Sequence, residues 1–235
     1  PRTIRSDVVP RRIPLLITVW FVASLFFLGD LGKYADDYFL SRHDPVSRSP
    51  LPLPSLGALS FARPLNWLVM AAVARSLWLD DHALHLVNAL AHGAVAALLA
   101  AVLLALGTSF AAAAATTALF LAYPAPYEVV LWPAALPIAL GCSLMLAACL
   151  ATVRLARREA AGRRSTGALV SIALLSFVIA CLYEQCAAAL IALPLLHRAA
   201  SPADTAAWRR SLRVGLVVAA SVAISTCATD SGCAW

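Results

Sequence analysis

The sequence has 235 residues, of which 62% are hydrophobic and 13% charged, with a mean hydropathy of +0.83. Soluble domains carry about 25% charged residues, so this composition excludes an ordinary soluble protein and predicts an all-α integral membrane protein. The net charge of +6 does not imply nucleic-acid binding, because the arginines are divided among short segments between apolar runs, where they would meet anionic lipid.

A membrane-spanning helix needs about 20 predominantly apolar residues, and the pattern predicts about seven spans. The first follows a cytoplasmic segment, 1–12. The spans are expected at residues 13–29, 83–106, 109–123, 129–153, 167–183, 185–197 and 214–229. The limit between the fifth and sixth is open, because Tyr183-Glu184-Gln185 interrupts the apolar run. Together the spans form one polytopic domain, 13–230.

The ends of the sequence suggest a longer protein. The chain starts with Pro1 and stops at Trp235, just after an apolar segment. We therefore expect a fragment whose C-terminal remainder is missing.

The distribution of charge orients these spans. With the N-terminus in the cytoplasm, cytoplasmic segments hold 13 of the 18 basic residues, as the positive-inside rule requires. Nine of the 12 acidic residues fall on the opposite face. Acids contribute little to orientation, so an outward-facing acidic site is expected.

The longest connection, residues 30–82, lies on that outer face. Its segment 61–79 carries apolar residues at three- and four-residue spacing, which predicts a helix along the membrane surface or dipping partly into it. A full extra span is the rival interpretation. It would move the arginines of residues 154–164 outside, which argues against it.

Several polar residues of the outer face are candidates for chemistry. The candidates in chain order are Asp36, Asp37, Arg63, His82, His85, Asn88, Glu128 and Glu184. The histidines and Asn88, with His92, share about a third of the circumference of one helix. Polar groups on a membrane helix usually face the bundle or a water-filled cavity. A zinc site with Asp81 is conceivable, but HxxH spacing alone supports no metal, so no metal or other cofactor is assigned.

The order of these motifs resembles the GT-C superfamily of multi-span glycosyltransferases, especially its O-mannosyltransferase-like and related bacterial members. The resemblance covers most of residues 15–197. The motifs are Asp36-Asp37, Arg63-Pro64-Leu65, His85-Leu-Val-Asn88-Ala-Leu-Ala-His92, Pro124 with Glu128-Val-Val-Leu-Trp132, and Tyr183-Glu184. Members of this family typically have more spans and often a C-terminal soluble part.

The resemblance implies transfer of a sugar from a polyprenyl-phosphate carrier to a protein, lipid or glycan acceptor outside the cytoplasm. An acid of the first outer loop is then the catalytic base, with Asp36 the first candidate and Asp37 its partner. The expected location is the bacterial inner membrane, among membrane lipids. Arg63 is preferred for the leaving phosphate, because arginine binds phosphate in a bidentate manner.

A non-enzymatic transporter or lipid-handling protein is the alternative. Ion-coupled transport would place acids near the middle of the membrane. Here the outer acids lie in loops or at the ends of spans, which favours chemistry at the surface.

Overall fold

The computed structural model describes residues 65–66, 68–69, 72, 81–122, 135–163, 165–201 and 205–230. Over these residues the chain is helical and contains no strand. The helices are α4 (Asp81–Ala105), α5 (Phe110–Ala122), α7 (Leu136–Ala160), α8 (Thr166–Leu182), α9 (Glu184–Ala189), α10 (Ala192–Ala200) and α11 (Thr205–Asp230).

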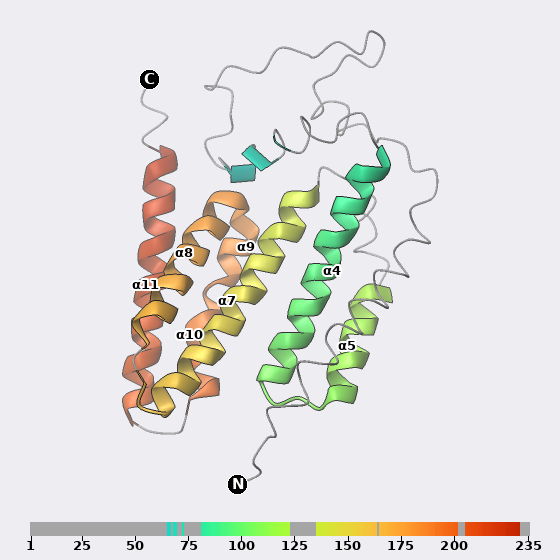
Figure 1. Cartoon of the computed structure of the whole chain (residues 1–235). Coiled ribbons are helices and arrows are strands. Elements are labelled where there is room, and N and C mark those ends of the chain that lie inside the picture. Colours follow the sequence, from blue (N-terminus) through green and yellow to red (C-terminus); the bar gives the residue numbers. More distant parts are fainter. Residues whose placement is uncertain are drawn as a thin grey trace.

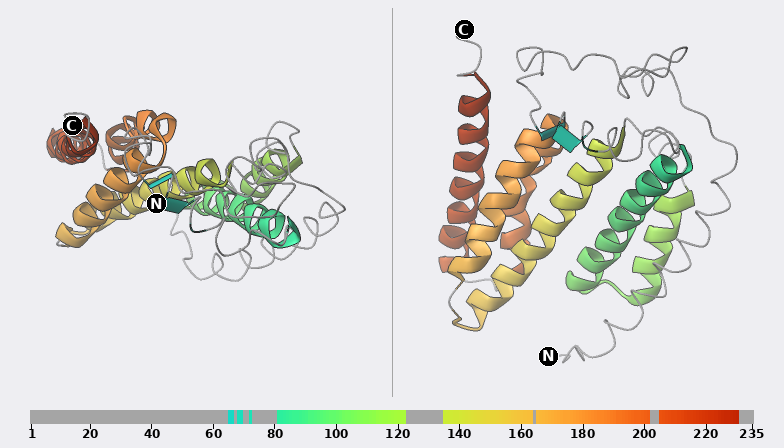
Figure 2. Two further views of the ribbon diagram at one scale, coloured as in Figure 1. Left: turned by 90° about the horizontal axis from the view of Figure 1, so that it is seen from above. Right: turned by 45° about the horizontal axis from the view of Figure 1, so that its top comes forward.

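The helices alternate in direction, so the bundle has two distinct ends (Figure 1). At the upper end, as drawn there, α4, α7 and α9 begin and α5, α8 and α11 end. At the lower end α4, α7 and α10 end and α5, α8 and α11 begin. Seen from above, the bundle is elongated, with α11 toward one end and α4 and α5 toward the other (Figure 2).

Two apolar clusters hold the bundle together. The larger one joins α7, α8, α9, α10 and α11 through Ala148, Leu155, Ile172, Ile179, Cys186, Leu190, Leu193, Val214 and Val218. The smaller one joins α4 to the start of α7 through Ala91, Leu136 and Ala139. Buried hydroxyls inside the helices are satisfied locally, as in Thr152 and Thr117, each of which donates to the carbonyl four residues earlier.

Two predicted spans differ from the helices observed. α7 continues seven residues beyond position 153, and α11 begins nine residues before position 214. Of the predicted cytoplasmic arginines that the structure describes, most, Arg154 and Arg213 among them, therefore lie on helices rather than in loops. Arginine is a good helix former, and a helix need not end where its apolar stretch ends.

The predicted span 185–197 is helical but interrupted, because α9 and α10 are separated by Leu190 and Ile191. Pro194 explains the break. Proline has no N–H to bond the carbonyl of Leu190, and its ring clashes with that carbonyl. The predicted interruption at Tyr183 is confirmed, since Tyr183 is extended (φ −159°, ψ 114°) between α8 and α9.

Only part of the predicted membrane topology is visible in the described residues. Within them, two helical segments are long and apolar enough to cross a membrane, His85–Ala105 and Leu136–Ala160. Three further apolar segments, Phe110–Leu121, Thr166–Leu182 and Gln185–Ala200, are shorter than a full crossing. The first predicted span, 13–29, lies outside the described residues.

The predicted surface helix is partly described. Residues 65–66, 68–69 and 72 are helical, in agreement with a helix over 61–79. Val69 packs against the smaller apolar cluster, whose members belong to α4 and α7. This segment of the outer loop therefore rests on the bundle itself.

Candidate functional site

The side chains of the polar residues predicted on one face of α4 are buried inside the protein. His85, Asn88 and His92 are 2%, 1% and 6% exposed. The ring of His92 stacks on that of Phe120 in α5, with centroids 4.8 Å apart. The spacing of these residues therefore does mark a buried polar face, as expected of polar groups on a membrane helix.

A described residue of the segment 61–79 lies near the contact between α4 and α7. Val69 packs against the smaller apolar cluster, which is formed by Ala91 of α4 and by Leu136 and Ala139 of α7. Ala91 precedes His92 directly along α4.

Glu184 is at the same end of the bundle. It is the first residue of α9, next to Tyr183, where α8 ends. The segment that contains Glu128 connects the end of α5 to the start of α7, and both of these helix ends are also at the upper end (Figure 1).

Several predicted site residues cannot be placed more closely. Asp36, Asp37, Arg63 and Glu128 lie outside the described residues. His82 and Glu184 belong to α4 and α9, but only their backbone is described. In the described part of the chain, no three His, Cys, Asp or Glu side chains are grouped as metal ligands would be.

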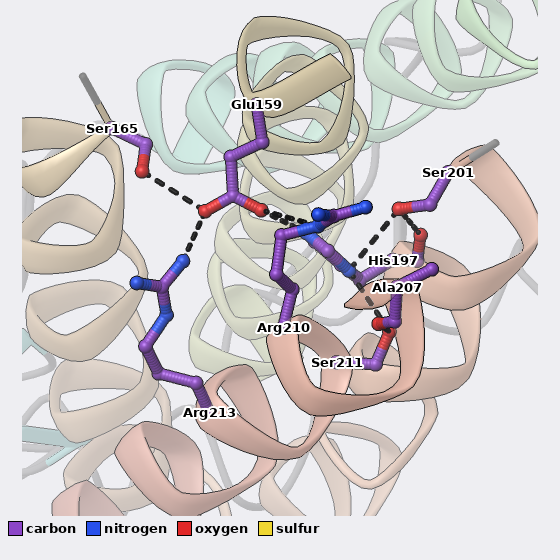
Figure 3. Close-up of polar contacts among 8 residues, drawn as sticks. All are labelled: Glu159, Ser165, His197, Ser201, Ala207, Arg210, Ser211 and Arg213. Carbon is purple, nitrogen blue, oxygen red and sulfur yellow. Dashed lines mark hydrogen bonds and ion pairs between the residues drawn. The ribbon is translucent and has the colours of Figure 1, made fainter. Parts of the chain in front are cut away.

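A second polar site, at the lower end, escaped the sequence analysis (Figure 3). Its centre is the carboxylate of Glu159, whose side chain is 6% exposed near the end of α7. Nε2 of His197, from α10, donates to Oε2 over 3.2 Å, and Ser165 Oγ donates to Oε1 over 3.0 Å. From α11, Arg213 donates to Oε1, and Nε of Arg210 lies 3.6 Å from Oε2.

The second ring nitrogen of His197, Nδ1, also has polar neighbours. Nδ1 lies 3.0 Å from Oγ of Ser211 and 3.5 Å from Oγ of Ser201. A carboxylate only accepts hydrogen bonds, so Nε2 carries a hydrogen. The single hydroxyl hydrogen of Ser211 is donated to the carbonyl of Ala207, 3.0 Å away. A protonated ring would donate from Nδ1 to Ser211 and keep that bond, whereas a neutral ring could accept from Ser211 only if the hydroxyl turned away from Ala207.

This arrangement, the Glu159 cluster (Glu159, Ser165, His197, Arg210, Ser211 and Arg213), ties α7 to α10 and α11. One carboxylate lies against two arginines and neutralises one of the two positive charges, and every helix that it joins ends or begins at the lower end. The hydroxyl of Ser211 does lie beside the imidazole of His197, but Ser211 is 1% exposed and its hydroxyl donates to the carbonyl of Ala207, so it is not presented to a substrate as a nucleophile would be. We therefore assign it to the stability of the bundle.

A signal for the cluster was present in the sequence. Glu159 is the only acid in the basic stretch from Arg154 to Arg164. A carboxylate retained among five arginines indicates pairing, but its partners lie 38 and 54 residues away. Only the fold identifies them.

Compared with known proteins, the chain matches no protein-family model, no curated protein and no solved structure. An assignment of function therefore depends on the residues themselves and on their arrangement.

Proposed function

We propose that this chain is a multi-pass membrane glycosyltransferase of the GT-C type. It transfers a sugar from a polyprenyl-phosphate donor to an acceptor on the face of the membrane at which α4 begins. In a bacterium this would be the outer face of the inner membrane.

The surface of the bundle supports a membrane location. Large apolar side chains are exposed outside the two long apolar segments as well, with Ile191 78%, Leu216 71% and Leu119 69% exposed. In water such groups would form costly apolar patches, whereas in lipid they are solvated. The two long apolar segments are also only 50% and 39% buried inside the protein, which suits helices with one face toward lipid.

The arrangement at the upper end carries the proposal. Val69, in the segment that follows Arg63 in the sequence, packs against the apolar cluster between α7 and α4, the helix that bears His85 and Asn88, and Glu184 begins α9 at the upper end. Two of the five motifs, His85–His92 and Tyr183-Glu184, thus belong to or adjoin helices that begin at this end of the bundle. The opposite end carries arginines, Arg157, Arg158 and Arg213 among them, as a cytoplasmic face would.

The chemistry requires a base, a site for phosphate and a means of holding the sugar. In an inverting transfer one carboxylate removes the acceptor proton while the lipid phosphate leaves from the opposite side of the sugar. Asp36 would act as this base, with Asp37 beside it. Two adjacent carboxylates in a cleft would repel one another. The pair would then keep one proton up to a higher pH, closer to the pH at which the enzyme works.

The remaining roles follow from charge. Arg63 would pair with the departing phosphate, which needs a cation or fixed donors. His82, His85, Asn88, Glu128 and Glu184 would line the donor or acceptor site. No metal is needed for these roles.

The test is direct transfer by the purified chain. We would reconstitute it in liposomes with polyprenyl-phosphate sugars labelled in the sugar, and add extracted bacterial membranes as the source of acceptor. Consumption of one donor, with label recovered in an acceptor, is expected. The control is the Asp36→Asn, Asp37→Asn double variant reconstituted at the same level. Equal donor consumption by the two proteins, or none by either, would count against the enzyme.

Transport is the second candidate, and the buried polar face of α4 favours it. A histidine in the middle of an apolar helix, such as His92, is typical of a permeation pathway. Flux of a solute through the same liposomes, without transfer of labelled sugar, would support this alternative.

A further inference from the structure

Two cysteines far apart in the sequence have their sulfur atoms in contact. Cys142 lies in the second turn of α7, and Cys186 is the third residue of α9. Their Sγ atoms are 4.0 Å apart, although 44 residues separate them. Both are reduced in this structure.

A glycine next to Cys142 allows this approach. A methyl group placed on Gly141 would lie 3.0 Å from Sγ of Cys186 and 3.7 Å from Cβ of Tyr183. A side chain at position 141 would therefore meet the sulfur of Cys186 first, and that sulfur would have to shift to admit it. The absence of a side chain at position 141 leaves room for Cys186 beside α7.

The surroundings allow the sulfurs to react. Cys142 is only partly buried, and Cys186 is 8% exposed. A disulfide requires a sulfur–sulfur distance of about 2.05 Å, so the two sulfurs, now 4.0 Å apart, must approach by about 2 Å in total.

We propose that Cys142 and Cys186 are a disulfide-forming pair that fastens the start of α9 to α7. The reaction is exchange with a small-molecule or protein disulfide. The thiolate of Cys142 attacks one sulfur of that disulfide and releases the first thiol. The thiolate of Cys186 then attacks the sulfur of Cys142 and releases the second. Two cysteine thiols are oxidised, one external disulfide is reduced, and the thiol protons pass to the two thiols released.

The position of the pair gives the bond a consequence. Glu184, the first residue of α9, is two residues before Cys186, and α9 is only six residues long. A covalent link at Cys186 would hold this short helix, and with it the backbone of Glu184, against α7. This inference is independent of the proposed glycosyltransferase activity.

The test counts thiols before and after oxidation. The purified chain in mild detergent would be treated with oxidised glutathione, denatured in the presence of N-ethylmaleimide, and weighed by mass spectrometry. The sequence has six cysteines, so the reduced chain takes six adducts. We expect four adducts after oxidation, and a linked peptide pair that contains Cys142 and Cys186.

The variants identify the pair. Cys142→Ser and Cys186→Ser should each abolish the link, whereas Cys149→Ser, in the same helix as Cys142, should still lose two reactive thiols on oxidation. Six adducts after oxidation, a persistent glutathione adduct on Cys142, or a link that maps to other cysteines would overturn the proposal. The peptide map of the parent protein decides the matter even if a variant folds poorly.

Discussion

Nε2 of His197 in α10 lies 3.2 Å from Oε2 of Glu159 in α7, and both side chains are withdrawn from solvent. The same carboxylate contacts Arg213 of α11. A single acidic side chain therefore joins three helices at the lower end of the bundle. Arg157 adds a link to a fourth helix, since it donates to the carbonyl of Ala105, the last residue of α4.

The first prediction concerns Glu159→Gln. The amide keeps the shape of the side chain but leaves two arginines without their counter-charge. Removing one partner of a fully buried pair costs about 3–5 kcal/mol. Because the side chain of Arg213 is 50% exposed and can regain water, we expect a loss of about 2 kcal/mol. The free energy of unfolding, measured by denaturant titration in mild detergent, checks this value.

Arg163→Gln is the matched control for that measurement. Arg163 is an exposed charge in the turn between α7 and α8, so its loss should change the free energy of unfolding by less than about 0.5 kcal/mol. If the two substitutions have equal effects, the Glu159 cluster does not stabilise the bundle.

The second prediction concerns Gly141→Ala. The added methyl group would lie 3.0 Å from Sγ of Cys186, and overpacking of this kind costs about 1–3 kcal/mol. We expect a loss of about 1 kcal/mol in the free energy of unfolding, the low end of that range, because the sulfur can give way slightly.

Two further substitutions make the second prediction specific. Gly167→Ala, in α8, meets no atom within 4 Å and should be neutral or stabilising by up to about 1 kcal/mol. Cys186→Ala removes the sulfur that clashes, so the cost of Gly141→Ala should shrink in that background. An unchanged cost would show that the contact with Cys186 is not its cause.

The third prediction separates the two acids of the outer loop. If Asp36 is the base, Asp36→Asn should lower the rate of sugar transfer by about 10²–10⁴-fold, the usual contribution of general-base catalysis. Asp37→Asn should have a smaller effect, because Asp37 acts by its charge alone. Initial rates in liposomes, at equal amounts of reconstituted protein, give the comparison. Full activity in both variants would rule out this pair as the base.

The fourth prediction is that the lower end of the bundle faces the cytoplasm. Arg163 and Ser109 are exposed residues in two different connections at the lower end. We expect Arg163→Cys and Ser109→Cys to react with a membrane-impermeant maleimide in inverted vesicles and not in intact spheroplasts, each gaining one adduct over the parent chain. Labelling from opposite sides would contradict the alternation of helices across a membrane.

Several features of the fold were predictable because they depend on local sequence. The long apolar runs predicted α4, α5 and α8 to within two residues at each end. The polar interruption at Tyr183 predicted the break between α8 and α9. The spacing of His85, Asn88 and His92 predicted a polar face, and burial of all three agrees. Each of these depends on hydropathy or on helical periodicity, both of which are properties of neighbouring residues.

Other features depended on the tertiary structure. The composition and the apolar runs of the sequence by itself determined a helical chain, and its charge pattern predicts one basic face and one acidic face. The pairing of Glu159 with His197 and Arg213, and the meeting of Cys142 with Cys186, was decided only when the helices packed. A contact between residues 38 to 54 positions apart depends on where helices end and how they cross, and a one-dimensional pattern of hydropathy contains neither.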